Sequence, residues 1–97
     1  MSHMAKQILY VDKSRDHIEH ITHLGTATSR YTKRGLVRRM EEKGKEYFTE
    51  GGGKRAYLVV AKSASGEKYV HTQPDSSKRD NLLSLPKCPA SLKEKTD

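Results

Sequence analysis

The chain has 97 residues, a single cysteine, a formal net charge of +7 and a mean hydropathy of −0.89. This length and polarity predict one small soluble domain, and they exclude an internal disulfide framework and a membrane-spanning segment. The lone cysteine, with no hydrophobic leader and no apolar span, predicts a cytoplasmic protein without a membrane partner. A positive field of this size attracts polyanions, so charge alone makes nucleic acid a candidate partner.

The polarity of the two ends sets the expected domain limits. Residues 1–4, MSHM, match the remnant of an expression tag, and the polar residues 90–97 are expected to be disordered. The sequence therefore predicts a single domain over residues 5–89.

Two β-rich runs come first in the chain. Residues 6–13, KQILYVDK, predict a strand that ends at a polar turn, and residues 17–24, HIEHITHL, predict its antiparallel hairpin partner. Gly25 and the TATS run that ends at Ser29 are expected to break this second strand.

A short helix is predicted next. Thr32 is the expected N-cap, because Leu36, Val37 and Met40 follow at helical spacing, and Gly44 stands where a helix C-terminus is commonly capped. A glycine inside this helix, at position 35, lowers its intrinsic stability by about 1 kcal/mol relative to alanine.

Three further strands are predicted in the second half. Residues 46–50 and 55–62 flank a glycine turn, and residues 68–73 follow the turn SASGE. Because tight turns join most neighbours, we expect an α+β fold with a mainly antiparallel sheet in the order β-β-α-β-β-β and one helix packed on one face. The segment 74–89, PDSSKRDNLLSLPKCP, is expected to fold its leucines back onto the sheet or an open edge.

The segment HIEHITH places His17, His20 and His23 within seven residues. On a helix, two of them would lie close enough to share a zinc ion, but on a strand His17 and His23 are about 20 Å apart. The isoleucines, the threonine and the short preceding turn favour the strand, so neither a metal site nor a cofactor is predicted. A mixed site of His23, His71 and Cys88 is the alternative, which no close pair of ligands in the sequence supports.

The sequence contains no enzyme signature. Residues 51–54, GGGK, lack the glycine spacing, the Lys-Ser/Thr pair and the following helix of a phosphate loop. Cys88 has no base positioned by its sequence neighbours and is interpreted as a spare thiol. We therefore expect a non-catalytic domain.

Basic residues gather in and around the predicted helix. On a helical wheel Arg34 and Arg38 point nearly opposite the apolar residues, which would lay an arginine ridge along phosphates. Glu41 and Glu42 interrupt this ridge, so a salt-bridged, solvated face is the alternative interpretation. The candidate nucleic-acid contacts are Lys33, Arg34, Arg38, Arg39 and Lys54.

Aromatic residues give a second, weaker indication. They offer stacking surfaces for unpaired bases, although tyrosines that alternate along strands more often pack in the core or across strands. No pair of aromatic RNA-recognition motifs is present, so base-specific recognition is not expected. The residues concerned are Tyr31, Tyr47, Phe48, Tyr57 and Tyr69.

The pieces ILYVDK, ITHLG, EYFTEGGGKRAYLVV and KYVHTQPDSSKRDNLLSLP occur in this order over residues 8–86. In this respect the chain resembles a family of small bacterial and phage domains that is known only as a domain of unknown function. The run 72–86, which ends in DNLLSLP, is the most specific part of the resemblance. The resemblance implies a compact domain that includes DNLLSLP, and it implies no activity, substrate or catalytic residue.

These observations together predict a small non-catalytic domain that binds DNA or RNA non-specifically through charge. The alternative is a protein-interaction or accessory module that uses an open sheet edge or an exposed sheet face.

Overall fold

The computed structural model describes residues 5–15, 17–51, 54–72 and 81–95. The predicted tag remnant at 1–4 and the first part of the predicted fold-back segment, at 74–80, lie outside these ranges. In chain order the elements are β1 (Lys6–Gln7), β2 (Tyr10–Lys13), the 3-10 helix η1 (Ile18–His20), β3 (Ile21–Gly25), β4 (Ser29–Thr32), α1 (Lys33–Glu42), β5 (Tyr47–Gly51), β6 (Lys54–Lys62), β7 (Lys68–Thr72), the 3-10 helix η2 (Asn81–Ser84) and β8 (Lys93–Lys95).

The strands form two four-stranded sheets, sheet A in the order β1-β5-β6-β7 and sheet B in the order β2-β3-β4-β8. β1 lies parallel to β5 and β8 lies parallel to β4, while the other neighbours are antiparallel. The α+β class is confirmed, with a single α-helix among the described residues, but the expected single, mainly antiparallel sheet in the order β-β-α-β-β-β was wrong. The parallel strands come from the two ends of the chain and pair with distant segments, which tight-turn signals cannot predict.

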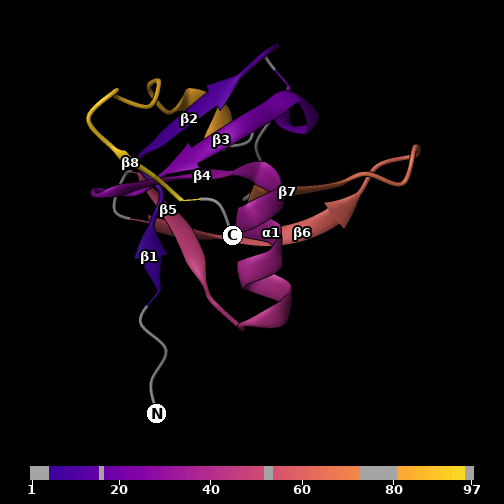
Figure 1. The fold of residues 1–97 in the computed structure, drawn as a ribbon. Coiled ribbons are helices and arrows are strands. Elements are labelled where there is room, and N and C mark those ends of the chain that lie inside the picture. Colours follow the sequence, from indigo (N-terminus) through magenta and orange to yellow (C-terminus); the bar gives the residue numbers. More distant parts are fainter. Residues whose placement is uncertain (1–4, 16, 52–53, 73–80, 96–97) are drawn as a thin grey trace.

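The run 6–13, predicted as one strand, passes from one sheet to the other (Figure 1). The Ile8 amide donates to Phe48 O in sheet A at 2.7 Å, and the next amide, Leu9, donates to Gly25 O in sheet B at 2.8 Å. Because successive amides of an extended chain point in opposite directions, this crossing joins the two sheets without a turn.

The segment HIEHITH, expected to be a strand throughout, divides in the middle. His17 caps η1, since its Nδ1 accepts a hydrogen bond from the Glu19 amide at 3.2 Å, and Ile18 packs against the core. Only the part from Ile21 onward is strand, and it pairs with β2 as predicted. A side chain that bonds its own backbone offers the chain an alternative to the sheet ladder.

Gly25 and the TATS run were expected to break the second strand, and β3 does end at Gly25, but the tight turn that follows leads into an extra strand, β4, that was not predicted. The Thr26 amide donates to Ser29 O at 2.8 Å, and the Ser29 amide donates back to Thr26 Oγ1 at 3.2 Å. The expected cap is confirmed, because Thr32 Oγ1 accepts from the Gly35 amide at 3.0 Å. Gly44 ends the helix with a φ of +63°, a conformation that favours glycine.

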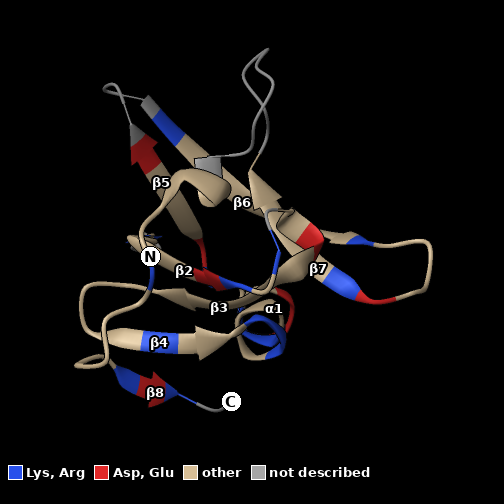
Figure 2. Ribbon diagram, turned by 90° about the horizontal axis from the view of Figure 1, so that it is seen from above, with Lys and Arg blue, Asp and Glu red and all other residues tan. Residues whose placement is uncertain are grey.

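The core lies between the two sheets, as the view from above shows (Figure 2). α1 contacts β3, β4 and β7, and η2 contacts β2, β5 and β7, so each helix closes the gap between the sheets from a different side. Within the described ranges no helix is both long and apolar enough to cross a membrane. The buried core residues are Ile8, Val11, Ile21, Leu24, Tyr31, Leu36, Val37, Tyr47, Leu58, Val70 and Leu82.

The two predictions for the C-terminal region have opposite outcomes. Leu82 is fully buried in the core, and Leu83 and Leu85 pack against it, as expected for the DNLLSLP segment. The end of the chain, predicted to be disordered from residue 90, instead contributes β8, which pairs with β4. The sequence of β8, Lys-Glu-Lys, has no apolar residue that would predict a strand. Pairing with β4, rather than intrinsic β-propensity, holds these residues in place.

Candidate functional site

Four of the five candidate cations lie on α1, and Lys54 lies apart from them at the start of β6 in sheet A. Leu36 and Val37 are buried, while Arg34 and Arg38 point outward and are exposed. The helix therefore places two guanidinium groups one turn apart on its outer surface. The Lys54 side chain lies outside the described part of the structure.

The Lys33 side chain makes contacts within the fold. Its Nζ lies 2.9 Å from Glu67 Oε1 and donates to the Glu19 carbonyl at 3.2 Å, and its side chain is only 15% exposed. The hydrogen bond and the charge of Lys33 lower the pKa of Glu67. This lysine therefore fastens α1 to the β6–β7 hairpin and to η1, and it is a poor candidate for a phosphate contact.

The arginines of α1 differ from one another in their surroundings. The guanidinium of Arg39 lies 4.8 Å from the ring centroid of Tyr31 and is half-buried, an arrangement that serves packing. Arg38 Nε lies 3.4 Å from Glu42 Oε2, and both side chains are exposed. Arg34 is exposed as well, and among the described residues no carboxylate pairs with it. The arginine ridge thus reduces to Arg34 and Arg38.

A groove on α1 has a volume of about 820 Å³, which falls within the roughly 300–1,000 Å³ typical of small-molecule sites. It runs between the outer surface of α1 and the tip of the β6–β7 hairpin, and Lys33, Arg34 and Arg38 line one wall. The Lys68–Glu41 ion pair, at 2.7 Å, crosses it alongside the Lys33–Glu67 pair. Acidic and basic side chains alternate in the lining, so the groove is polar and nearly neutral.

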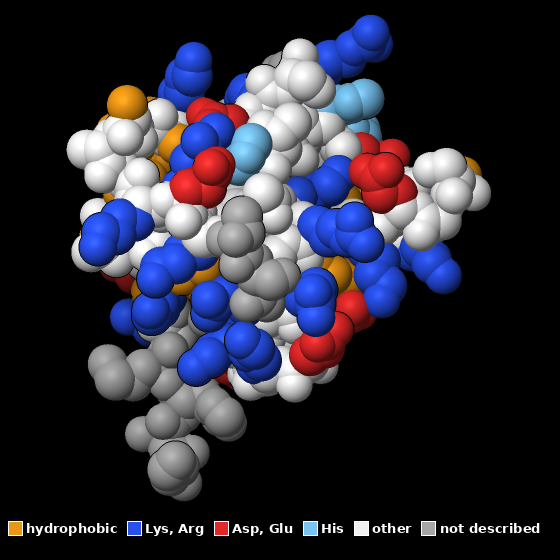
Figure 3. All heavy atoms as spheres, in the orientation of Figure 1, with side chains coloured by type: hydrophobic (Ala, Val, Ile, Leu, Met, Phe, Trp, Pro, Cys, Tyr) orange, Lys and Arg blue, Asp and Glu red, His pale blue; other side chains and the backbone are white. Residues whose placement is uncertain are grey.

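Outside this groove, cations dominate the same side of the molecule. Figure 3 shows Lys and Arg side chains spread over the face that α1 presents, with fewer acidic side chains in several separate groups among them. The basic side chains on this face therefore extend beyond the groove and beyond α1.

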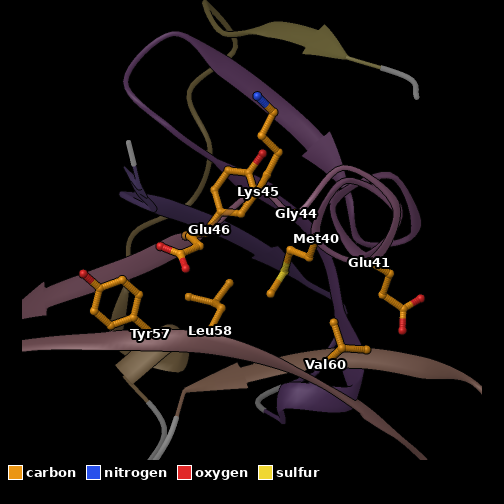
Figure 4. A pocket seen from close by; sticks show the side chains of 9 residues that line it. Met40, Glu41, Gly44, Lys45, Glu46, Tyr57, Leu58 and Val60 are labelled. Carbon is orange, nitrogen blue, oxygen red and sulfur yellow. The ribbon is translucent and has the colours of Figure 1, made fainter. Parts of the chain in front are cut away.

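The aromatic residues are mostly unavailable for stacking. Tyr31, Tyr47 and Phe48 are buried, and the first two form an edge-to-face pair at 6.2 Å. Tyr57, at 44%, is the exposed large hydrophobic residue of the described part. It lies at the rim of a hollow between the end of α1 and β6 (Figure 4), where Leu58 and other apolar side chains form a small floor and Glu46 borders the opening.

The histidines are not arranged as a metal site. In the ranges that the structure describes, no group of three or more His, Cys, Asp or Glu side chains is placed to hold a metal ion. The rings of His17 and His20 meet edge-to-face at 6.0 Å, and His23 lies 3.7 Å from Glu94.

A polar network that the sequence did not reveal lies on the outer face of sheet B. Arg30 on β4 binds Asp12 on β2 through Nη2 at 2.9 Å and Glu94 on β8 through Nη1 at 3.1 Å. Asp12 Oδ1 also accepts a hydrogen bond from the Cys88 amide at 3.1 Å. Burial and the neighbouring Asp12 carboxylate raise the pKa of the Cys88 thiol to about 11, so this cysteine is a poor nucleophile.

The fold and the surface together define the class of protein: a small basic α+β domain with one helix and two mixed sheets. Residues 7–86 match the model of the family described as Protein of unknown function (DUF3892), and the chain belongs to this family. The resemblance seen in the sequence is thereby confirmed at the level of a small domain family of unknown function. No curated protein and no solved structure matched the chain.

Proposed function

We propose that this cytoplasmic domain is non-catalytic and binds nucleic acid without sequence preference, through phosphate contacts made by the exposed face of α1. The observation that carries the proposal is the pair of exposed guanidiniums, Arg34 and Arg38, one turn apart on a face rich in cations (Figure 3). Guanidinium forks match phosphate oxygens in geometry and stay charged at any physiological pH.

The Arg38–Glu42 pair does not prevent such contacts. Both side chains are more than half exposed, and the two groups lie four residues apart on one helix. Exposed pairs of this kind contribute about 0.3–0.5 kcal/mol, so a phosphate can replace the glutamate at little cost. Lys33 and Arg39, by contrast, are held by other parts of the fold and are expected to contribute little.

The test is fluorescence anisotropy with labelled single-stranded and double-stranded DNA and RNA, at low and near-physiological salt. Replacing Arg34 and Arg38 by alanine removes two phosphate contacts, so the slope of log affinity against log salt should decrease by about 1.8 for duplex DNA. Base-specific discrimination is not expected, because phosphate contacts carry no sequence information.

A matched control removes the same charge elsewhere. Arg15 lies in the turn between β2 and η1 and Lys87 lies between η2 and β8; both are exposed, and these segments lie away from the C-terminal half of α1 (Figure 1). The Arg15→Ala/Lys87→Ala protein should keep most of the affinity. Equal losses in the two double variants, or no binding at near-physiological salt, would show that the charge acts only as a general field.

A further inference from the structure

The C-terminal residues 87–95, which we call the strap, cross the outer face of sheet B from one edge to the other (Figure 1). Just before the strap, the Pro86 carbonyl accepts from the Val11 amide on β2 at 2.9 Å; near its end, the Lys93 amide donates to Thr28 O beside β4 at 3.3 Å. The strap begins where the family match, at residues 7–86, ends. The surface beneath the strap lies within the matched residues, and the strap itself follows them.

Three features of the strap are recognised by this surface. The Cys88 amide donates to Asp12 Oδ1 at 3.1 Å. Leu92 lies directly over Gly25, so closely that a Cβ at Gly25 would come within 2.9 Å of Leu92 Cδ1. Two residues further on, the Glu94 carboxylate meets Arg30 Nη1 at 3.1 Å.

The strap is held weakly compared with the sheet that it covers. All three residues of β8 are exposed. The apolar contact next to β8 is that of Leu92 with Gly25. Segments with few buried apolar contacts open at a small fraction of the global unfolding free energy. The strap is thus placed to leave its site while the domain stays folded.

Part of the site is held by contacts that do not involve the strap. Arg30 is bound to Asp12 at 2.9 Å as well as to Glu94, so its guanidinium remains oriented by β2. His23 on β3 lies 3.7 Å from the same glutamate oxygen and adds a second cation when it is protonated. The β4 edge would then present unpaired backbone groups, the usual requirement for docking of an extended segment.

We propose that the outer face of sheet B, with the β4 edge, is a binding site for an extended peptide of a partner protein that carries a leucine two residues before a glutamate. The strap occupies this site within the chain and regulates access to it. This goes beyond nucleic-acid binding, because it uses another surface and another class of ligand. It also specifies which sheet edge, that of β4, would serve the protein interaction that the sequence indicated as the alternative function.

General electrostatic attraction would not explain such binding. The strap carries Lys87, Lys93 and Lys95 against one glutamate, so it is itself positive, as is the protein. A peptide of this composition is repelled by the field of the whole molecule and must be held by specific contacts.

The experiment uses a fluorescein-labelled peptide of residues 86–95, with serine in place of Cys88, titrated into two full-length proteins. Wild type should bind it weakly, because the tethered strap competes at an effective concentration of the order of millimolar. The Leu92→Ala/Glu94→Ala protein, whose own strap docks poorly, should bind it at least tenfold more tightly.

Two controls test the proposed contacts. Adding Gly25→Ala to the double variant fills the space that the peptide leucine needs, and it should reduce affinity at least tenfold. A peptide with the same composition in scrambled order should not bind. Equal, weak binding by both proteins, or binding of the scrambled peptide, would overturn the proposal. A concentration-dependent dimer that the free peptide dissociates would assign the site to a second copy instead of a separate partner.

Hydrogen exchange of the wild-type protein tests the opening without any substitution. The Lys93 amide should exchange at least tenfold faster than the Leu9 amide, which donates to Gly25 within the family domain. Equal rates would mean that the strap opens only with the whole fold, and the proposal would fail. Because nucleic-acid binding is measured separately on the α1 variants, failure of one proposal leaves the other unaffected.

Discussion

Two arginines show how differently one kind of side chain is used in this domain. Arg38 on α1 pairs with Glu42 four residues away, and their side chains are 51% and 61% exposed. Arg30 on β4 lies between Asp12 and Glu94, two carboxylates from different strands of sheet B, and the Asp12 side chain is only 14% exposed. The first pair is local and solvated, whereas the second network is non-local and partly shielded from water.

The difference separates an ion pair that a ligand can replace at little cost from an ion pair whose loss destabilises the fold. Exchange of Glu42 for a phosphate costs little, because water already screens the Arg38 pair. Removal of Arg30 leaves the Asp12 carboxylate, at 14% exposed, without its partner, which is a much larger penalty, whereas Glu94, at 52% exposed, is the solvated end of the network. Nucleic acid is therefore expected on the helix face, and only a ligand that reproduces the glutamate is expected at Arg30.

The largest expected effect is that of Arg30→Met, which keeps the length of the side chain but removes its charge. The Asp12 carboxylate then loses its ion-pair partner in a shielded position, and we expect the free energy of unfolding to decrease by about 2–3 kcal/mol, below the value for a fully buried pair. Urea denaturation followed by circular dichroism measures the change. A loss smaller than 1 kcal/mol would mean that the network is no better shielded than the helix face.

The thiol of Cys88 reports on the same network. Burial and the Asp12 charge raise its pKa to about 11 from an ordinary 9.0, so alkylation by iodoacetamide at pH 8 should be roughly a hundredfold slower than for an unstructured peptide. The unfolded thiol ionises first as pH rises, so the free energy of unfolding should decrease between pH 9 and about 11.

Two controls accompany this measurement. A Cys88→Ser protein should lack this part of the alkaline decrease, since serine does not titrate there. The Leu92→Ala/Glu94→Ala protein, with its strap loosened, should react faster than wild type. Alkylation of wild type at the rate of the free peptide would contradict the shielded position of the thiol.

The features predicted correctly from the sequence are those whose partners lie close by in the chain. The Thr32 cap bonds Gly35 three residues later, and the helix ends at Gly44, so local pattern and local geometry coincide. The outward direction of Arg34 and Arg38 follows from the same periodicity.

The features that were missed depend on partners far along the chain. Arg30 meets Asp12 across 18 residues and Glu94 across 64, and no periodic pattern connects them. β8 has the composition of a solvated tail, and it is a strand only because β4 lies beside it. Gly25 ends β3, as expected, but the space that it leaves for Leu92 could not be predicted, because Leu92 lies far along the chain.

On the helix face, Arg38→Met should lower the free energy of unfolding by no more than about 0.5 kcal/mol, as is usual for an exposed pair four residues apart. The loss should shrink further in 1 M salt, because screening weakens the wild-type pair. The same urea denaturation measures both values beside those for Arg30→Met. An Arg38 effect as large as that of Arg30 would remove the distinction between the two regions.

The smallest expected change concerns Glu67, which joins the hairpin tip to Lys33. The hydrogen bond and charge of Lys33 lower the pKa of this carboxyl from its ordinary 4.5, so its stabilising contribution is present above pH 4.5 and is lost as pH falls through the lowered pKa. In Lys33→Met the Glu67 pKa should return toward its ordinary value, which carboxyl NMR titration measures.

Arg34→Met is the matched control, since it removes a neighbouring charge without touching the pair and should leave the Glu67 pKa low. If both substitutions raised the Glu67 pKa equally, the general positive field of α1 would account for the lowered pKa. Lys33 would then be available as a further phosphate contact on the helix face.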